Sequence, residues 1–154
     1  EELKQRFLFV YDMAARDLCE AWSRDADGVL ALCLVLDQFP RNMFRGHPQA
    51  FATDEKALHI AKIALHKGFD QVLTPVKRRF VYLPFEHSES LQDQGRSVKL
   101  FESMKDSDPM GVEYALRHYE IIKKFARFPH RNAILGREST PAEREYLAQS
   151  NAGF

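Results

Sequence analysis

Apolar residues recur at helical spacing through most of this sequence, in segments separated by prolines and glycines. From Leu3 to about Arg24 they repeat every three or four residues, which predicts an amphipathic helix with one core face. The nearly unbroken apolar run from Val29 to Leu36 predicts a fully buried helix, because it is rich in Leu and Ala and has no partner strand elsewhere. We expect this helix to end within residues 37–40, since Pro40 cannot continue a helix.

Three further helices are predicted in the middle of the chain. One should open at Pro48 and end at Gly68, a residue suited to the left-handed cap. A short helix should run from Thr74 to about Pro84. A longer helix should open at Pro84 and place His87 on the same inward stripe as Leu91, four residues later.

Side-chain caps predict the last two helices. Asp108 followed by Pro109 should start one, and Thr140 with Glu143 has the spacing of a capping box. Taken together, the patterns predict an all-α array of six or seven antiparallel helices with no sheet, in a single helical domain over residues 1–154.

Composition narrows the functional classes. Lys plus Arg and Asp plus Glu both number 22, so there is no basic excess of the kind that a nucleic-acid-binding domain usually carries. No run of about 18 apolar residues is present, so no membrane span is expected. Cys19 and Cys33 lie on apolar helical faces, which indicates buried thiols and a reducing, cytoplasmic setting. No cofactor is predicted, and the patterns leave the oligomeric state open.

Two segments ninety residues apart resemble each other and concentrate polar side chains. Residues 38–46 read QFPRNMFRG, and residues 127–137 read RFPHRNAILGR. Arg41 and Asn42 correspond to Arg131 and Asn132, while His130 is the additional residue of the second copy.

The sequence resembles a bacterial domain family of unknown function, DUF924. Three blocks carry the resemblance: DQFPRNMFRG at 37–46, YLPFEHSE at 82–89 and RFPHRNAILGREST at 127–140. The resemblance covers essentially the whole chain and implies an all-helical fold similar to tetratricopeptide-repeat proteins, in the cytoplasm, with no agreed activity. The family usually has a further segment before Leu3, and commonly has glycine where Ala126 stands.

The polar residues of these blocks are the candidate functional site. Apolar stripes and helix caps do not require so many polar residues at helix ends, and we expect the three blocks to lie on one side of the molecule. We predict that the site binds an anionic small molecule or an acidic peptide end, because arginine forks bind carboxylate and phosphate and amides add neutral donors. The predicted ligand-binding residues are Asp37, Gln38, Arg41, Asn42, His118, Arg127, His130, Arg131, Asn132 and Arg137. The alternative is structural: the same arginines would pair with nearby carboxylates, Glu138 among them, and hold irregular turns together.

Two other functions remain open. His87 with Glu86 or Glu89 would form a general acid–base pair, in which case the protein is an enzyme; Ser88 is better explained as a hydroxyl that satisfies a backbone amide than as a nucleophile. A protein-binding scaffold is the other alternative, by analogy with tetratricopeptide repeats. No metal site is predicted, because paired helical ligand spacing is missing. The remaining histidines, His47, His59 and His66, are expected at the surface.

Overall fold

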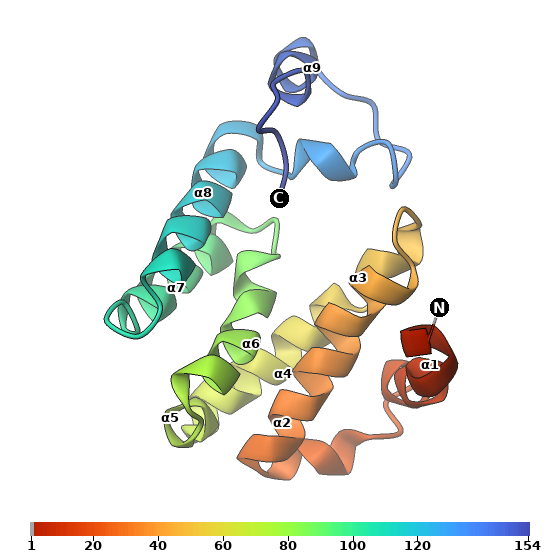
Figure 1. Ribbon diagram of the computed structural model, residues 1–154, viewed down its shortest axis with the longest axis vertical. Helices are drawn as coiled ribbons and strands as arrows, with labels where there is room; N and C mark the ends of the chain where they lie inside the picture. Colours follow the sequence, from red (N-terminus) through yellow and green to blue (C-terminus); the bar gives the residue numbers. More distant parts are fainter. Residues whose placement is uncertain (1) are drawn as a thin grey trace.

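A computed structural model describes residues 2–154, and over that range the chain is all-helical, as predicted (Figure 1). The helices are α1 (Glu2–Ala15), α2 (Ala26–Cys33), α3 (Phe39–Met43), α4 (Asp54–Lys67), α5 (Phe69–Val72), α6 (Pro75–Glu86), α7 (Leu91–Glu102), α8 (Pro109–Phe125) and α9 (Pro141–Leu147). Helices α3 and α5 are too short to give a periodic pattern in the sequence. No helix within residues 2–154 is both long and apolar enough to cross a membrane.

Two hydrophobic clusters hold the helices together. One lies among α2, α4, α6, α7 and α8 and contains the completely buried rings of Tyr82, Phe85 and Phe101. The other lies among α1, α2, α3 and α4 and includes the buried Tyr11. Ile60 of α4 packs against both clusters, so α4 joins the two halves of the core.

Three helix ends set by a glycine or a side-chain cap are confirmed, but the helix expected to open at Pro48 begins at Asp54, after a 3-10 turn over Pro48–Phe51. Gly68 adopts φ +72 at the end of α4, and Asp108 caps α8 by accepting a hydrogen bond from the Gly111 amide. The Thr140 capping box is complete, with Glu143 bonding back to the Thr140 amide. Ala126, which follows α8, adopts φ +61, the left-handed conformation that favours glycine.

The prediction of one helix from Leu3 to Arg24 is wrong, because α1 ends at Ala15. Asp17 adopts a positive φ of 62, and a short 3-10 segment follows over Glu20–Arg24. Lys56 of α4 fixes this turn by donating to Ala15 O at 2.6 Å and pairing with Asp17 at 2.7 Å. A contact from a distant helix therefore ends α1. Cys19 and Cys33 are buried and free, as predicted.

Pro40 does not end the helical backbone where it was expected to. A π-helical turn over Leu34–Gln38 follows α2, and the Phe39 amide bonds back to Leu34 O across five residues. The extra residue of this turn lets the chain re-enter α3 with Pro40 in its first turn, where a missing N–H costs little.

Pro84 also lies inside a helix. Helix α6 continues to Glu86, His87 caps it, and α7 begins only after Ser90. Gln94 stabilises the break by donating to Glu86 O at 2.6 Å and Ser88 O at 2.7 Å. His87 therefore lies at the end of α6 and not on the inward stripe of α7.

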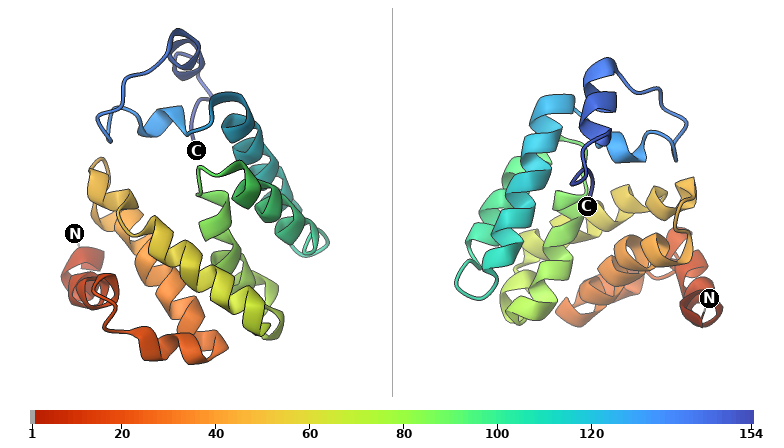
Figure 2. Two further views of the ribbon diagram at one scale, coloured as in Figure 1. Left: turned by 180° about the vertical axis from the view of Figure 1, so that it is seen from behind. Right: turned by 45° about the horizontal axis from the view of Figure 1, so that its top comes forward.

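The helix arrangement brings distant ends together. The end of α3, the end of α6 and the segment after α8 converge, and the chain after α9 turns back toward the same region (Figures 1 and 2). The three polar blocks meet at this junction.

Candidate functional site

A cavity of about 400 Å³ lies at the junction of the three polar blocks. Two arginines, three histidines and Glu86, all predicted as ligand-binding or catalytic residues, line it together with three phenylalanines. The lining residues are Arg41, Phe51, Glu86, His87, His118, Phe128, His130, Arg131 and Phe154. The volume falls within the range of small-molecule sites.

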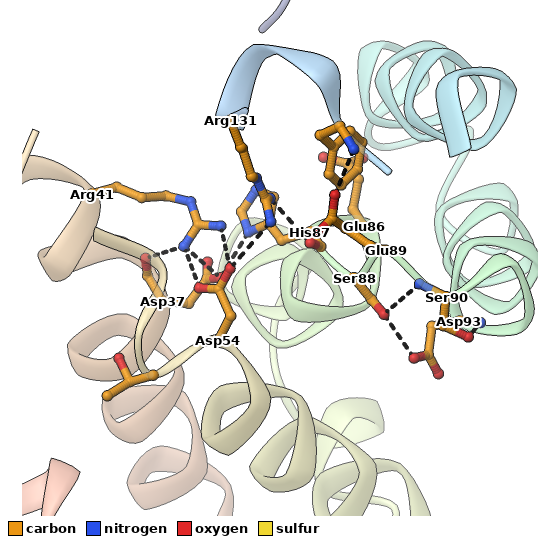
Figure 3. Close-up of polar contacts among 12 residues, drawn as sticks. Asp37, Arg41, Asp54, Glu86, His87, Ser88, Glu89, Ser90, Asp93 and Arg131 are labelled. Atoms are coloured by element: carbon orange, nitrogen blue, oxygen red, sulfur yellow. Dashed lines mark hydrogen bonds and ion pairs between the residues drawn. The ribbon is translucent and has the colours of Figure 1, made fainter. Parts of the chain in front are cut away.

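Asp37 is the buried centre of the site. The π-helical turn carries it, and its side chain is completely buried. Its carboxylate accepts a hydrogen bond from His87 Nδ1 at 2.7 Å (Figure 3). It accepts a second one from Gln38 Nε2 at 2.6 Å. Burial acts to raise the pKa of Asp37, but His87, Arg41 and Gln38 outweigh burial and lower the pKa to about 2. Asp37 is thus an anion that orients His87, with Gln38 as a supporting contact.

Arg41 is already neutralised by two carboxylates. It forms a bidentate pair with Asp54, at 2.7 and 2.9 Å, and lies 3.3 Å from the Asp37 carboxylate (Figure 3). Although burial acts to lower it, Asp37 and Asp54 hold the pKa of Arg41 above its usual value. Asp54, which opens α4, was not predicted from the sequence, because nothing there sets it apart from other acidic residues in a first helical turn.

Arg131 is in the opposite situation. Its side chain is only 7% exposed, and its guanidinium lies 4.6 Å from the ring centroids of both Phe51 and Phe128. Within residues 2–154 the guanidinium makes one hydrogen bond, from Nη2 to His87 O at 3.1 Å, and its buried Nε has no partner. Asp54 lies 3.7 Å away and is committed to Arg41. Burial lowers the pKa of Arg131 to about 10.

Glu86 and His118 form another wall of the cavity. Burial raises the pKa of Glu86 to about 8, with smaller contributions from Asp37 and Asp108 that Arg79 opposes, so the carboxyl is mostly protonated at neutral pH. Its Oε1 atom is buried and has no hydrogen-bond partner among residues 2–154. His118 Nδ1 donates to Tyr114 O at 2.7 Å and lies 3.8 Å from Glu86.

His118 and His130 are neutral histidines. Burial lowers the pKa of His118 to about 3 and that of His130 to about 4. Because Nδ1 of His118 donates to a carbonyl, its proton is on that nitrogen and Nε2 is an acceptor. Nδ1 of His130 is buried without a partner. Polar atoms on Glu86, His130 and Arg131 thus stay unpaired around one cavity, although buried polar groups are normally paired.

The remaining residues of the third block hold the loop together instead of lining the cavity. Asn132 is 1% exposed; it donates to Glu143 at 2.7 Å and accepts from Arg137 Nε at 3.0 Å. Arg137 pairs bidentately with Glu89, at 2.8 and 3.2 Å, and Arg127 pairs with Glu143. These contacts match the structural alternative for Arg127, Asn132 and Arg137.

Other predicted residues are also engaged elsewhere. Glu89 accepts from the Phe128 amide at 2.6 Å as well as from Arg137, so both of its oxygens are committed to holding the loop. Asn42 is exposed and bonds within its own helix, to Gln38 O. Ser88 accepts from the Ser90 amide and donates to Asp93, the amide-satisfying role expected for it. Within residues 2–154 no group of three or more His, Cys, Asp or Glu side chains is placed to hold a metal ion.

A second, more open hollow of about 620 Å³ adjoins the cavity. It shares Phe51, His87 and Arg131 with the cavity and extends along the start of α4 toward His59 and Lys62. The phenylalanines Phe51, Phe128 and Phe154 were missed from sequence because apolar residues carry no signal that separates a cavity wall from the core.

The fold and the cavity define an all-helical protein with a polar site at a junction of helix ends. The chain belongs to the family described as "Bacterial protein of unknown function (DUF924)", whose model matches residues 1–151. It is similar to a solved structure of a protein of unknown function from Agrobacterium tumefaciens, at 42% identity and a TM-score of 0.90, with 94% of this chain and 81% of that chain covered. No curated protein matches the chain.

Proposed function

We propose that the cavity binds a small anionic molecule, with Arg131 as its anchor. The observation that carries this proposal is the contrast between the two corresponding arginines. The Arg41 guanidinium is saturated by Asp54 and Asp37. The buried Arg131 guanidinium donates one hydrogen bond to a protein carbonyl, lies 3.7 Å from Asp54, and has an Nε without a partner among residues 2–154. A guanidinium has five N–H donors in a fork that matches carboxylate or phosphate, and a buried cation whose ion pair is as long as 3.7 Å is only partly compensated. An anion at Arg131 completes that compensation.

The size and chemistry of the cavity support a small ligand over a protein-binding scaffold. Arg41, His87, His130 and Arg131 surround one cavity instead of being spread along a groove. The neutral His118 and His130 and the protonated Glu86 are hydrogen-bonding groups without opposing negative charge. The free thiols of Cys19 and Cys33 favour a reducing, cytoplasmic setting for this function.

Titrations with inorganic phosphate and with acetate, followed in ¹H–¹⁵N correlation spectra, test the proposal. We expect saturable shifts at the Arg131 Nε–H and at amides around the cavity. Arg131→Gln should abolish these shifts, and Arg131→Lys, which keeps the charge but loses the fork, should weaken binding. Arg45→Ala is the matched control, because Arg45 lies in the corresponding segment and is exposed. The proposal fails if neither anion binds saturably, or if Arg131→Lys binds as tightly as the wild type; thermal melts confirm that the variants are folded.

Acid–base catalysis is a second candidate function for the same cavity, favoured by the Asp37–His87 contact. Asp37 holds Nδ1 of His87 at 2.7 Å, which leaves Nε2 as the nitrogen available for general-base work. Glu86, mostly protonated at neutral pH, is the matching acid. Asp37, which the sequence predicted to be a ligand-binding residue, therefore takes the role of orienting His87.

Hydrolysis of 4-nitrophenyl acetate and 4-nitrophenyl phosphate at neutral pH tests the catalytic candidate. We expect a rate above buffer that His87→Gln removes and Asp37→Asn reduces, with a shifted pH profile. A rate that His87→Gln leaves unchanged, or no rate with either ester, argues against catalysis on these two classes of bond.

A further inference from the structure

The ring of Phe154 is packed inside the mouth of the cavity. It stacks on the His118 ring with a centroid separation of 3.6 Å and an interplanar angle of 16°. Phe128 and His130 meet it edge-on, with centroids 6.1 and 5.7 Å away. The Arg117 guanidinium lies 5.5 Å from its centroid. One stacked ring, two edge-on rings and a guanidinium thus surround a position that fits a planar aromatic ring.

The segment that carries Phe154 is held lightly. After α9 ends at Leu147, the chain turns back toward the segment that follows α8 (Figure 1), and Phe154 lines the cavity. Gly153 donates its amide to Tyr146 Oη at 3.0 Å and adopts φ +82, a conformation that glycine reaches without strain. Phe154 itself is 52% exposed. The ring can therefore leave its position without opening the hydrophobic core.

The ring position and the Arg131 guanidinium lie close to the same side chain. The centroid of Phe128 is 4.6 Å from the Arg131 Cζ atom and 6.1 Å from the centroid of Phe154. Phe154, Phe128 and Arg131 all line the cavity. One small molecule that carries an acid group beside a planar ring would contact both places at once.

We infer that the ligand of this cavity is an anion bearing a planar aromatic ring, and that Phe154 occupies the position of that ring until the ligand displaces it. The inference rests on the proposed anion site at Arg131 and adds the class of ligand. The acid group binds the Arg131 guanidinium, and the ring stacks on the neutral His118 imidazole in place of Phe154. Displacement releases the Gly153 amide from Tyr146, so the segment after α9 acts as a lid that reports binding.

Three probes separate the anchor from the ring position: inorganic phosphate, phenyl phosphate and cyclohexyl phosphate. Each is titrated into the wild type, Phe154→Ala and the control Phe9→Ala, which removes a ring that is 74% exposed on α1. In Phe154→Ala we expect phenyl phosphate to bind about tenfold more tightly than inorganic phosphate and more tightly than cyclohexyl phosphate, because stacking adds to the anion contact. Phe154→Ala should tighten phenyl phosphate several-fold relative to the wild type and leave inorganic phosphate unchanged. In the wild type, phenyl phosphate should shift the Gly153 amide and inorganic phosphate should not.

The outcomes distinguish the two proposals. If inorganic phosphate binds but phenyl phosphate binds Phe154→Ala no more tightly than it binds the wild type, Phe154 is a fixed wall of the cavity. The ring position is then overturned while the anion site stands. Equal affinity for phenyl and cyclohexyl phosphate overturns the stacking contact. If none of the three probes binds any variant, the anion site fails together with the inference.

Discussion

Replacing Glu86 by glutamine should make the protein more stable at neutral pH. Glu86 is 4% exposed, its Oε1 atom has no partner, and the nearest histidine nitrogen, on His118, is 3.8 Å from its other oxygen. Burial raises its pKa from 4.5 to about 8, because the ionised form loses its hydration inside the protein. A glutamine side chain at this position would have nearly the same shape and no charge to bury.

The magnitude follows from the difference in proton binding between the folded and unfolded states. The folded state holds the Glu86 proton more tightly, so this contribution to stability is complete below about pH 4.5 and is lost as the pH rises through about 8. At pH 7 the unfolded chain is ionised at this position while the folded protein is mostly not. About 2.5 pH units then separate the solution from the unfolded pKa, which corresponds to a loss on the order of 3 kcal/mol. Glu86→Gln avoids this loss.

Urea unfolding of the wild type and Glu86→Gln at pH 5, 7 and 9 measures the effect. The gain in free energy of unfolding should be small at pH 5, on the order of 3 kcal/mol at pH 7 and larger at pH 9. Glu55→Gln is the matched control, because Glu55 is exposed and its replacement should change stability by less than about 0.5 kcal/mol. A gain that does not depend on pH, or a loss at pH 7, would refute the assignment of Glu86 as a buried, protonated carboxyl. If Glu86→Gln stabilises the protein, the glutamate lowers stability, and a destabilising residue in a cavity indicates a functional role.

Three further substitutions test the surroundings of the cavity. Asp37→Asn should lower the free energy of unfolding by about 2 kcal/mol at pH 7, because the lowered pKa of Asp37 stabilises the fold while the carboxylate is ionised. The difference from the wild type should shrink as the pH falls from about 4 toward 2. Urea unfolding at several pH values measures this difference, and a difference that grows on acidification contradicts the prediction. Asn132→Ala should cost about 2 kcal/mol in the same assay, since Arg137 and Glu143 lose a buried partner, and an unchanged midpoint would mean that the loop is held by other contacts. Ala126→Gly should raise the free energy of unfolding by about 0.5–1 kcal/mol because its φ is +61, and a lower thermal midpoint would show that this left-handed position carries no strain.

Helix ends set by a glycine or a side-chain cap were predictable from the sequence, whereas ends signalled by proline alone and ends with a tertiary cause were not. Gly68, Asp108 and Thr140 act through backbone groups a few residues away, so their spacing in the sequence is sufficient. The end of α1 at Ala15 depends on Lys56, 41 residues away, which no local pattern reveals. The π-helical turn before Pro40 likewise has no signature in the apolar pattern.

The candidate site divides in the same way. The residue types predicted that the three polar blocks form the candidate site. The cavity is lined by Arg41, His87, His118, His130 and Arg131 from that prediction. Their division into cavity lining and loop support depends on which carboxylate each arginine reaches. Those pairs span 13 residues for Arg41 with Asp54 and 48 for Arg137 with Glu89, and the all-helical topology decides them.

The corresponding arginines of residues 38–46 and 127–137 therefore lie in different electrostatic environments. Arg41 directly follows Phe-Pro, Arg131 follows Phe-Pro after His130, and both guanidinium groups approach Asp54, at 2.7 Å for Arg41 and 3.7 Å for Arg131. Asp54 gives both of its oxygens to Arg41, which also lies 3.3 Å from the Asp37 carboxylate, so Arg131 keeps the longer contact with Asp54. The Arg131 guanidinium donates to one carbonyl and packs against two aromatic rings, and its Nε has no partner within residues 2–154. His130, the additional residue of the second segment, lines the same cavity and also has a buried nitrogen without a partner in that range. The first segment supplies a structural ion pair, whereas the second segment carries a buried arginine whose Nε has no partner within residues 2–154, and the proposed anion site rests on that difference.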